Sequence, residues 1–137
     1  MQIYRVLILI FFALFVSACE DYPVYATNTS SIKNILPLSC INIATFNPKL
    51  SKPLKEKFKS LNNKECKYRL TGYIHFVNSC DNPDTKSLGA DFNGYVRLYI
   101  KEDNKIIYKV QSDFKSNEVS AIDRVLQKVT KDIFFSR

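Results

Sequence analysis

The chain has 137 residues, which is long enough for one domain and short for two. Hydrophobic residues make up 46% of it and aromatic residues 13%, which excludes a disordered chain, and its three glycines form no phosphate-binding loop. The formal net charge of +7 favours anionic partners.

The first 18 residues have the features of a secretory signal peptide. They carry one positive charge, Arg5, followed by an unbroken apolar run from Val6 to Val16. A helix needs about 20 apolar residues to cross a bilayer, so this run is short for a permanent span and has the length of a signal-peptide core.

The apolar run ends in Val16-Ser17-Ala18-Cys19, which places an aliphatic residue and two small residues before a cysteine. This segment resembles the lipobox of bacterial lipoproteins. The resemblance implies that the Cys19 sulfur receives a diacylglyceryl group, that signal peptidase II removes residues 1–18, and that fatty acids such as palmitate anchor the mature chain. Two or three acyl chains hold a protein stably on a membrane, whereas one does so only marginally. The alternative is an ordinary secretory signal with a chance cysteine.

The residue after the anchor bears on the choice of membrane. In enteric bacteria an aspartate directly after the lipidated cysteine retains a lipoprotein at the inner membrane. Glu20 stands there in this chain, so the resemblance implies the outer membrane, facing the periplasm, with the inner membrane as the alternative. Loss of Arg5 with the leader leaves a formal charge of +6, the total of +7 less one. The anionic groups outside the cytoplasm are lipid headgroups, lipopolysaccharide phosphates and acidic cell-wall polymers, and nucleic acid is not an expected partner.

The segment after the anchor predicts a tether. Residues 19–34 are polar, contain Pro23 and show no periodic pattern, which is typical of a linker. The folded domain is therefore expected at residues 35–137.

The first part of the domain predicts a strand, a helix and a second strand. The strand is expected at residues 39–46 and is ended by Asn47-Pro48. Ser51 and Pro53 mark a helix start, and apolar residues then recur at helical spacing at Leu50, Leu54, Phe58 and Leu61. Residues 66–78 alternate between apolar and polar side chains, which predicts the second strand.

The second part predicts a hairpin and a closing helix. A polar loop at residues 79–93 leads into strands at 94–101 and 106–114, joined by a compact turn at 102–105. A helix is expected at about 118–134, with a buried stripe of Val119, Ile122, Val125, Leu126, Val129 and Ile133. The order β-α-β-β-β-α predicts an α+β fold, a two-layer sandwich with both helices on one face of a small mixed sheet.

This order of elements is similar to that of two groups of bacterial envelope lipoproteins. The first strand INIATF, the strand YRLTGYI and the hairpin GYVRLYIKEDNKIIYKV resemble the pattern of penicillin-binding-protein activators and curli-secretion-type lipoproteins. The lipopolysaccharide-assembly lipoprotein that plugs an outer-membrane barrel has a similar order and also ends in a helix. The resemblance covers roughly residues 38–135 and implies a role in envelope assembly, without assigning functional residues.

The sequence contains no recognisable catalytic motif. His75 is the only histidine, and no H-x-E, C-x-x-C or G-x-S-x-G motif is present. Asp81 and Asp84 lie in the polar loop, where turn formation explains them. The chain is therefore not expected to be an enzyme or to hold a metal or another cofactor.

One face of the expected sheet combines aromatic and basic side chains. If the helices cover the face that carries Leu70, Val96 and Leu98, the other face is open. Tyrosine rings stack on sugars or cations, and basic groups pair with phosphate or carboxylate, so such a face suits binding. The alternative is that tyrosine occurs there only because it is a good strand former. The expected open face consists of Arg69, Tyr73, His75, Tyr95, Arg97, Tyr99, Lys101 and Lys109.

The mature chain has three further cysteines, Cys40, Cys66 and Cys80, in an oxidising compartment. Cys66 and Cys80 bracket one extended strand, which keeps them roughly 40 Å apart, too far for a disulfide. Cys40 and Cys66 each open a strand. If these strands are parallel neighbours, their starts meet at one sheet edge, so a Cys40–Cys66 disulfide with Cys80 free is expected.

The leading hypothesis is a non-catalytic, membrane-anchored envelope lipoprotein that binds a protein or an anionic glycolipid in outer-membrane or cell-wall assembly. The rival is a small periplasmic hydrolase or inhibitor-type module that uses the polar loop at residues 79–93.

Overall fold

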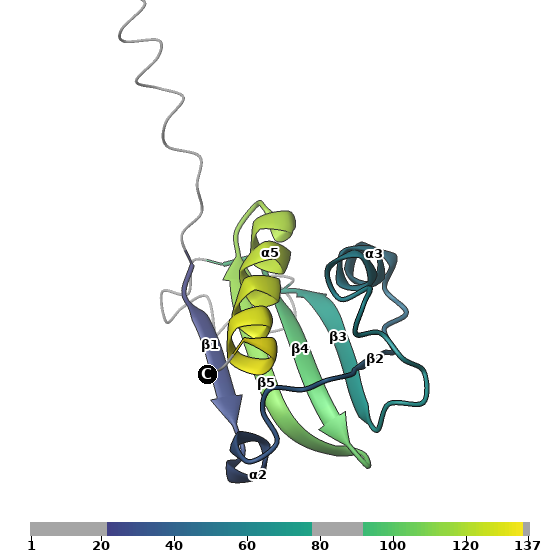
Figure 1. Cartoon of the computed structure of the whole chain (residues 1–137). Helices are drawn as coiled ribbons and strands as arrows, with labels where there is room; N and C mark the ends of the chain where they lie inside the picture. Colours follow the sequence, from purple (N-terminus) through teal and green to yellow (C-terminus); the bar gives the residue numbers. More distant parts are fainter. Residues whose placement is uncertain (1–21, 78–91, 136–137) are drawn as a thin grey trace, which may run out of the picture.

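The structure, a computed structural model, describes residues 22–77 and 92–135. These residues form a sheet of five strands with helices packed against it (Figure 1). The strands are β1 (Val24–Asn28), β2 (Asn42–Ile43), β3 (Tyr68–Phe76), β4 (Gly94–Glu102) and β5 (Lys105–Phe114). The helices are α2 (Ser30–Lys33), α3 (Pro48–Lys57), α5 (Glu118–Val129) and the π-helical turn η1 (Thr130–Phe134).

The sheet is mixed, and its strand order is β1-β5-β4-β3-β2. β2 pairs in parallel with β3, and every other neighbouring pair is antiparallel. The α+β class, the mixed sheet and the parallel crossover from β2 through α3 to β3 are thus confirmed.

The expectation of a tether up to residue 34 is wrong. β1 adds to the sheet edge, with Val24 opposite Ser112 and Asn28 opposite Tyr108. The hydroxyl group of the buried Ser112 donates a hydrogen bond to the Pro23 carbonyl at 3.4 Å. The same hydroxyl oxygen accepts a hydrogen bond from Arg124 Nε at 2.8 Å. The short helix α2 then buries Ile32 completely. The folded domain therefore begins well before residue 35, because β5 offers this segment a pairing edge.

The segment expected as a first strand at residues 39–46 pairs regularly over only two residues. Asn42 and Ile43 lie opposite Arg69 and Leu70, and the backbone N–H of Ala44 donates to the Leu70 carbonyl at 2.9 Å. α3 then begins earlier than expected, because the Asn47 side chain accepts the Lys49 backbone N–H at 3.0 Å and a proline occupies the first turn.

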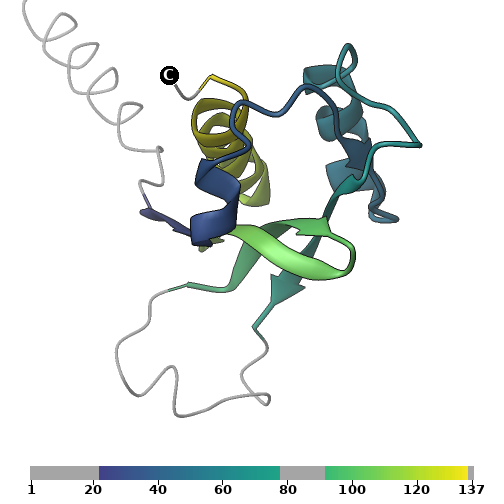
Figure 2. The same cartoon turned by 60° about the horizontal axis from the view of Figure 1, so that its bottom comes forward.

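Both long helices cover the same face of the sheet, as expected (Figure 2). Lys49 of α3 forms an ion pair with Glu118 of α5. An aromatic contact also joins the end of α3 to η1, with the Phe58 and Phe134 ring centroids 4.8 Å apart. The predicted stripe of the last helix is buried with one exception. Val119 is 60% exposed, because it points away from the sheet in the first turn while Ala121 is buried.

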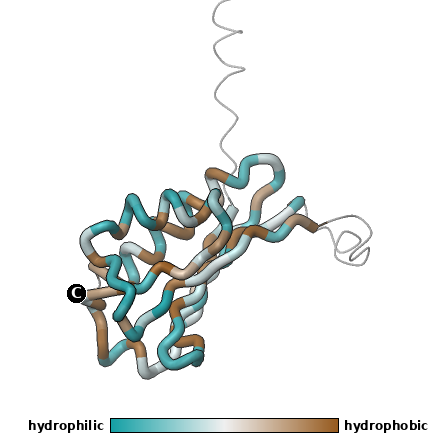
Figure 3. Tube along the Cα trace, turned by 90° about the vertical axis from the view of Figure 1, so that its right-hand side faces the viewer, coloured by the Kyte–Doolittle hydropathy of each residue, from teal (hydrophilic) through white to brown (hydrophobic). Residues whose placement is uncertain are grey.

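The core lies between this helix layer and the covered face of the sheet. Hydrophobic positions recur along the strands with more polar positions between them (Figure 3). Gly72 lies on the covered face of β3, where a Cβ atom would come within 2.6 Å of the Arg97 carbonyl oxygen and 2.4 Å of a Leu98 methyl group. A glycine here therefore permits the close approach of β3 and β4. The fully buried strand residues include Leu70, Val96, Leu98, Ile100, Tyr108 and Val110.

The hairpin turn has the backbone of a two-residue primed turn. Asp103 and Asn104 both have positive φ, 48° and 68°. Asp and Asn tolerate this left-handed region better than other residues with side chains, and the turn matches the right-handed twist of β4 and β5.

Tyr108 is a buried ring with a polar partner. Its hydroxyl donates to Asp132 Oδ2 at 3.1 Å, and Lys128 Nζ donates to Asp132 Oδ1 at 3.0 Å. Burial and then the Asp132 carboxylate raise the pKa of Tyr108 well above its ordinary value. The folded chain therefore holds this proton at a pH where the unfolded chain, with a tyrosine pKa of about 10, releases it.

This difference predicts alkaline destabilisation through Tyr108. The contribution is fully present below about pH 10 and declines as the pH rises further, because the unfolded state then binds fewer protons than the folded state. Tyr108→Phe keeps the ring and removes this proton, so its free energy of unfolding should fall less steeply than that of the wild type between about pH 10 and pH 11. Denaturant titrations across this range measure the slopes. Tyr25→Phe, at an exposed tyrosine, is the control and should match the wild type; equal slopes for all three proteins would contradict the assignment.

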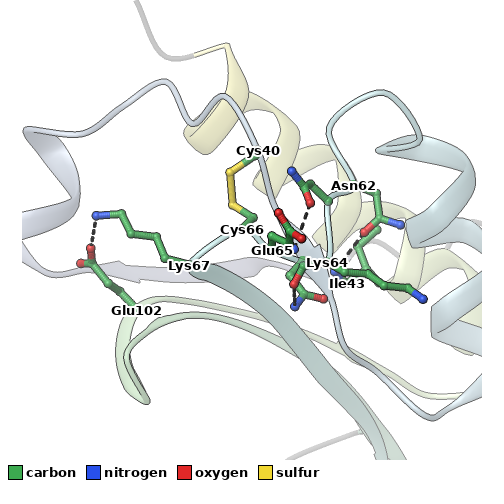
Figure 4. Close-up of a disulfide and its surroundings, with 10 residues drawn as sticks. Cys40, Ile43, Asn62, Lys64, Glu65, Cys66, Lys67 and Glu102 are labelled. Atoms are coloured by element: carbon green, nitrogen blue, oxygen red, sulfur yellow. Dashed lines mark hydrogen bonds and ion pairs between the residues drawn. A yellow bond between two sulfur atoms is a disulfide. The ribbon is translucent and has the colours of Figure 1, made fainter.

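A disulfide joins Cys40 to Cys66, which is the pairing that the sequence analysis expects (Figure 4). The Cα atoms are 6.0 Å apart. The physical reason is also the expected one, since β2 and β3 are parallel neighbours and both cysteines lie just before them. Cys80, expected to be free, lies outside the described residues.

The disulfide closes a loop with a sequence separation of 26 residues. Replacing both cysteines by serine should lower the free energy of unfolding by about 3 kcal/mol, because the unfolded chain regains loop entropy. Equilibrium denaturation of the double variant, beside wild type treated with reductant, measures the loss. Peptide mapping of non-reduced protein checks the pairing, and a Cys66–Cys80 peptide would contradict it.

Candidate binding face

The sheet face opposite the helices carries the side chains that the sequence analysis expects there. No helix of residues 22–77 or 92–135 lies on it (Figure 2). The register brings Tyr73 opposite Arg97 and His75 opposite Tyr95 across β3 and β4. On the other side of β4, Tyr99 lies opposite Lys109. We call this surface the open face. Its expected members, placed on three adjacent strands by register, are Arg69, Tyr73, His75, Tyr95, Arg97, Tyr99, Lys101 and Lys109.

Arg97 lies at the centre of a tyrosine cluster. Its Nη1 donates to the hydroxyl groups of Tyr73 at 3.1 Å and Tyr99 at 3.3 Å, and these two hydroxyl oxygens are 3.4 Å apart. Its guanidinium carbon is 4.7 Å from the centroid of the Tyr95 ring, which is cation–π distance. One cation therefore fixes three rings relative to one another.

The rings also contact each other. The Tyr73 centroid is 6.0 Å from that of Tyr95 in an edge-to-face arrangement and 6.1 Å from that of Tyr99. His75 lies over Tyr95 with centroids 5.0 Å apart. The result is an ordered aromatic surface, of which Tyr73 is 38% exposed.

A glutamine and an aspartate missed by the sequence analysis complete the cluster. Gln111 Oε1 accepts from Arg97 Nε at 2.7 Å and also from Nη2, and Gln111 Nε2 donates to Asp113 at 2.9 Å. The alternation that placed Lys109 on the open face also places these two residues there, so the strand pattern already contained the signal.

Several features of the cluster act on the charge of Arg97. Partial burial by itself lowers its pKa, but the hydrogen bond to Tyr99 and the nearby Tyr73 and Tyr95 outweigh burial, so the pKa is raised. The guanidinium therefore remains a cation, as is usual for arginine in proteins.

The basic residues at the other end of the open face are less constrained. Arg69 and Lys101 lie directly opposite each other on β3 and β4, and neither forms an ion pair with a carboxylate of the described residues. Like charges in such a cross-strand pair repel each other, so this end of the face favours an anion.

A wider hollow of about 600 Å³ lies away from the open face, beside β1, α2 and η1. Asp132, the one carboxylate among the described residues that line it, is already hydrogen-bonded to Tyr108 and Lys128. Asp132 and Lys128 thus pair with each other, and none of the expected open-face residues lines this hollow.

Other predicted positions lie outside the described residues. These are the lipidation residue Cys19 and the loop at 79–93 with Asp81 and Asp84, on which the rival hydrolase or inhibitor hypothesis depends. Within the described ranges, no three His, Cys, Asp or Glu side chains come together in a way that could hold a metal ion. In the same part of the chain, no helix has the length and apolar character needed to cross a membrane.

Comparisons with known proteins give no family. No family model matches the chain, and no curated protein matches it. Two solved structures of the PelC dodecamer from Paraburkholderia phytofirmans, one of them a point variant, are similar with 9% sequence identity and a TM-score of 0.46. Each alignment covers 82% of this chain and 98% of that chain. Similarity at this level says nothing about what the chain binds or where it resides.

Proposed function

We propose that this protein is a non-catalytic envelope lipoprotein, anchored through Cys19, whose open face binds an anionic glycolipid or an acidic protein partner in outer-membrane or cell-wall assembly. The observation that carries the proposal is the open face itself, where Arg97 holds Tyr73, Tyr95 and Tyr99 in an ordered arrangement that no described helix covers.

The physical argument rests on preorganisation. Free tyrosine side chains lose rotamer freedom when a ligand orders them, and that loss weakens binding. On the open face, Arg97 already restricts Tyr73 and Tyr99 by hydrogen bonds and Tyr95 by a cation–π contact. The Tyr73 ring also contacts the Tyr95 ring. A pyranose ring or an amphipathic surface that stacks on them therefore meets little further ordering cost.

The positive charge of the open face determines which partners it favours. Arg69 and Lys101 lie at one end of the aromatic cluster and Lys109 lies opposite Tyr99, and the whole chain carries a formal charge of +7. A partner with phosphate or carboxylate groups gains favourable electrostatic energy on this surface and associates faster. Lipopolysaccharide-type glycolipids combine sugars with such groups.

The anchor is tested with Cys19→Ser. This variant should remain an unprocessed precursor that incorporates no labelled fatty acid, because serine lacks the sulfur that receives the diacylglyceryl group. Metabolic labelling and membrane fractionation measure both effects. Cys80→Ser, which leaves the lipobox-like segment intact, is the control and should be labelled normally. Label retained by the Cys19→Ser chain would defeat this part of the proposal.

The open face is tested by charge reversal. Arg97→Glu with Lys101→Glu should weaken binding to lipopolysaccharide by about tenfold or more, because the double variant removes two cations and disperses the tyrosines. Lys52→Glu with Lys55→Glu makes the same change in net charge on exposed positions of α3 and should bind nearly as the wild type does. Co-sedimentation measures binding, and thermal melts check that both double variants remain folded.

Complementation of a deletion strain extends this test to an unidentified partner. The α3 double variant should restore function and the open-face double variant should not. If the two variants bind and complement equally well, the open face is not the binding surface.

A further inference from the structure

A pocket of about 270 Å³ lies at the basic end of the open face. It is bounded by β2, the segment before β3, the first residues of β3, and the turn between β4 and β5. Its lining combines four cationic side chains with two amides, namely Lys64, Lys67, Arg69, Lys101, Asn42 and Asn104. Of these six residues, the sequence analysis assigned only Arg69 and Lys101 to the open face.

The positive charge of this pocket is only partly neutralised by described residues. Lys67 forms an ion pair with Glu102, with its Nζ 2.7 Å from a carboxylate oxygen, and this contact raises the pKa of Lys67. Lys64, Arg69 and Lys101 have no such partner among residues 22–77 and 92–135. A bound oxyanion between Arg69 and Lys101 would attract both cations and so offset their cross-strand repulsion.

The pocket walls are held in place by covalent and hydrogen bonds (Figure 4). The Cys40–Cys66 disulfide ties the segment that carries Lys64 and Lys67 to the start of β2. Asn42 Nδ2 donates to the Lys64 carbonyl at 2.9 Å, and Asn62 Oδ1 accepts from the Ile43 backbone N–H at 3.2 Å. Such a site needs little rearrangement to bind a ligand.

Arg97, by contrast, has little capacity left for an oxyanion. Four of its five N–H groups donate to Gln111, Tyr73 and Tyr99. Arg97 therefore positions the tyrosines, while Lys64, Arg69 and Lys101 of the pocket have no carboxylate partner among the described residues.

The lining also contains acceptors, which a bare phosphate does not need. Asp103 is the one acidic residue among the described residues that line the pocket, and the amide oxygens of Asn42 and Asn104 add neutral acceptors. Sugar hydroxyl groups donate hydrogen bonds to such oxygens. Along β4, Lys101 is two residues from Tyr99, which corresponds to about 7 Å in an extended strand. An acidic group and the ring of the sugar that bears it span such a distance.

We propose that this pocket binds the carboxylate or phosphate of an acidic sugar residue whose ring extends toward Tyr99 and Tyr73 on the open face. The proposal rests on the proposed function and deepens it by naming the chemical class of the ligand and the residues that select it. The acidic sugar belongs to a polysaccharide or to the headgroup of a glycolipid, which present the same chemistry.

The test uses the full chain, purified in detergent, and isothermal titration calorimetry. The probes are a tetrasaccharide of glucuronic acid, its neutral glucose counterpart, a phosphorylated disaccharide headgroup of lipid A type, inorganic phosphate, and phosphatidylglycerol vesicles. The variants are Arg69→Gln and Lys101→Gln. Lys52→Gln removes one cation from an exposed position of α3, outside the pocket and the open face, and is the matched control.

An acidic saccharide should bind, and the neutral tetrasaccharide should bind at least about tenfold more weakly, because it lacks the charge-assisted hydrogen bonds. Each pocket variant should weaken acidic-saccharide binding by about tenfold, whereas Lys52→Gln should change it by less than about threefold. Binding of the tetraglucuronate indicates a polysaccharide source, and preference for the phosphorylated disaccharide indicates a glycolipid source.

Three results would overturn the inference. They are equal affinity for acidic and neutral saccharides, acidic-saccharide binding that is unchanged in both pocket variants, and binding to vesicles or inorganic phosphate with no binding to either acidic saccharide. Lipopolysaccharide binding that needs Arg97 but neither Arg69 nor Lys101 would refute the pocket and leave the proposed function intact. Thermal melts in each variant exclude loss of folding as the cause.

Discussion

The pairing of β3 with β4 decides which side chains of this protein meet. Nine consecutive pairs run from Tyr68 opposite Glu102 to Phe76 opposite Gly94 without a break. Because side chains alternate between the two faces of a sheet, this register places Leu70, Val96 and Leu98 on the face that the helices cover. It places Tyr73, Tyr95 and Tyr99 on the open face. A slip of one residue would bury Arg97 and expose the core, so the core and the open face depend on the same ladder.

This dual dependence explains which features the sequence could predict. Long strands with one apolar face carry a strong period-two pattern, so β3, β4 and β5 and the composition of the open face were predictable. The Cys40–Cys66 pairing was predictable for a related reason, since a parallel crossover brings the starts of its two strands to one edge.

The features that the sequence analysis missed depend on distant partners. β1 has no distinctive local pattern, and it becomes a strand because Ser112 and Tyr108 lie in a β5 edge that can pair with it. Likewise β2 was predicted too long, because its regular pairing with β3 covers only two residues. The pocket at the basic end was missed because Lys64 and Lys67 lie in a segment without regular structure, whose position is set by the disulfide and by Asn42.

The cations on the open face divide into one that orders the tyrosines and others that keep their donors available for an external oxyanion. A single arginine could not do both. An arginine that orders its neighbours does so by donating hydrogen bonds from its N–H groups. Arg97 donates four such hydrogen bonds, to Tyr73, Tyr99 and Gln111. A residue that binds an external oxyanion must keep its donors free, as Arg69 and Lys101 do with respect to described carboxylates. Arg69 and Lys101 repel each other across the strands, in a region where the disulfide, the hairpin turn and the β3–β4 ladder restrain the backbone. An anionic ligand in the proposed pocket would offset this repulsion on binding.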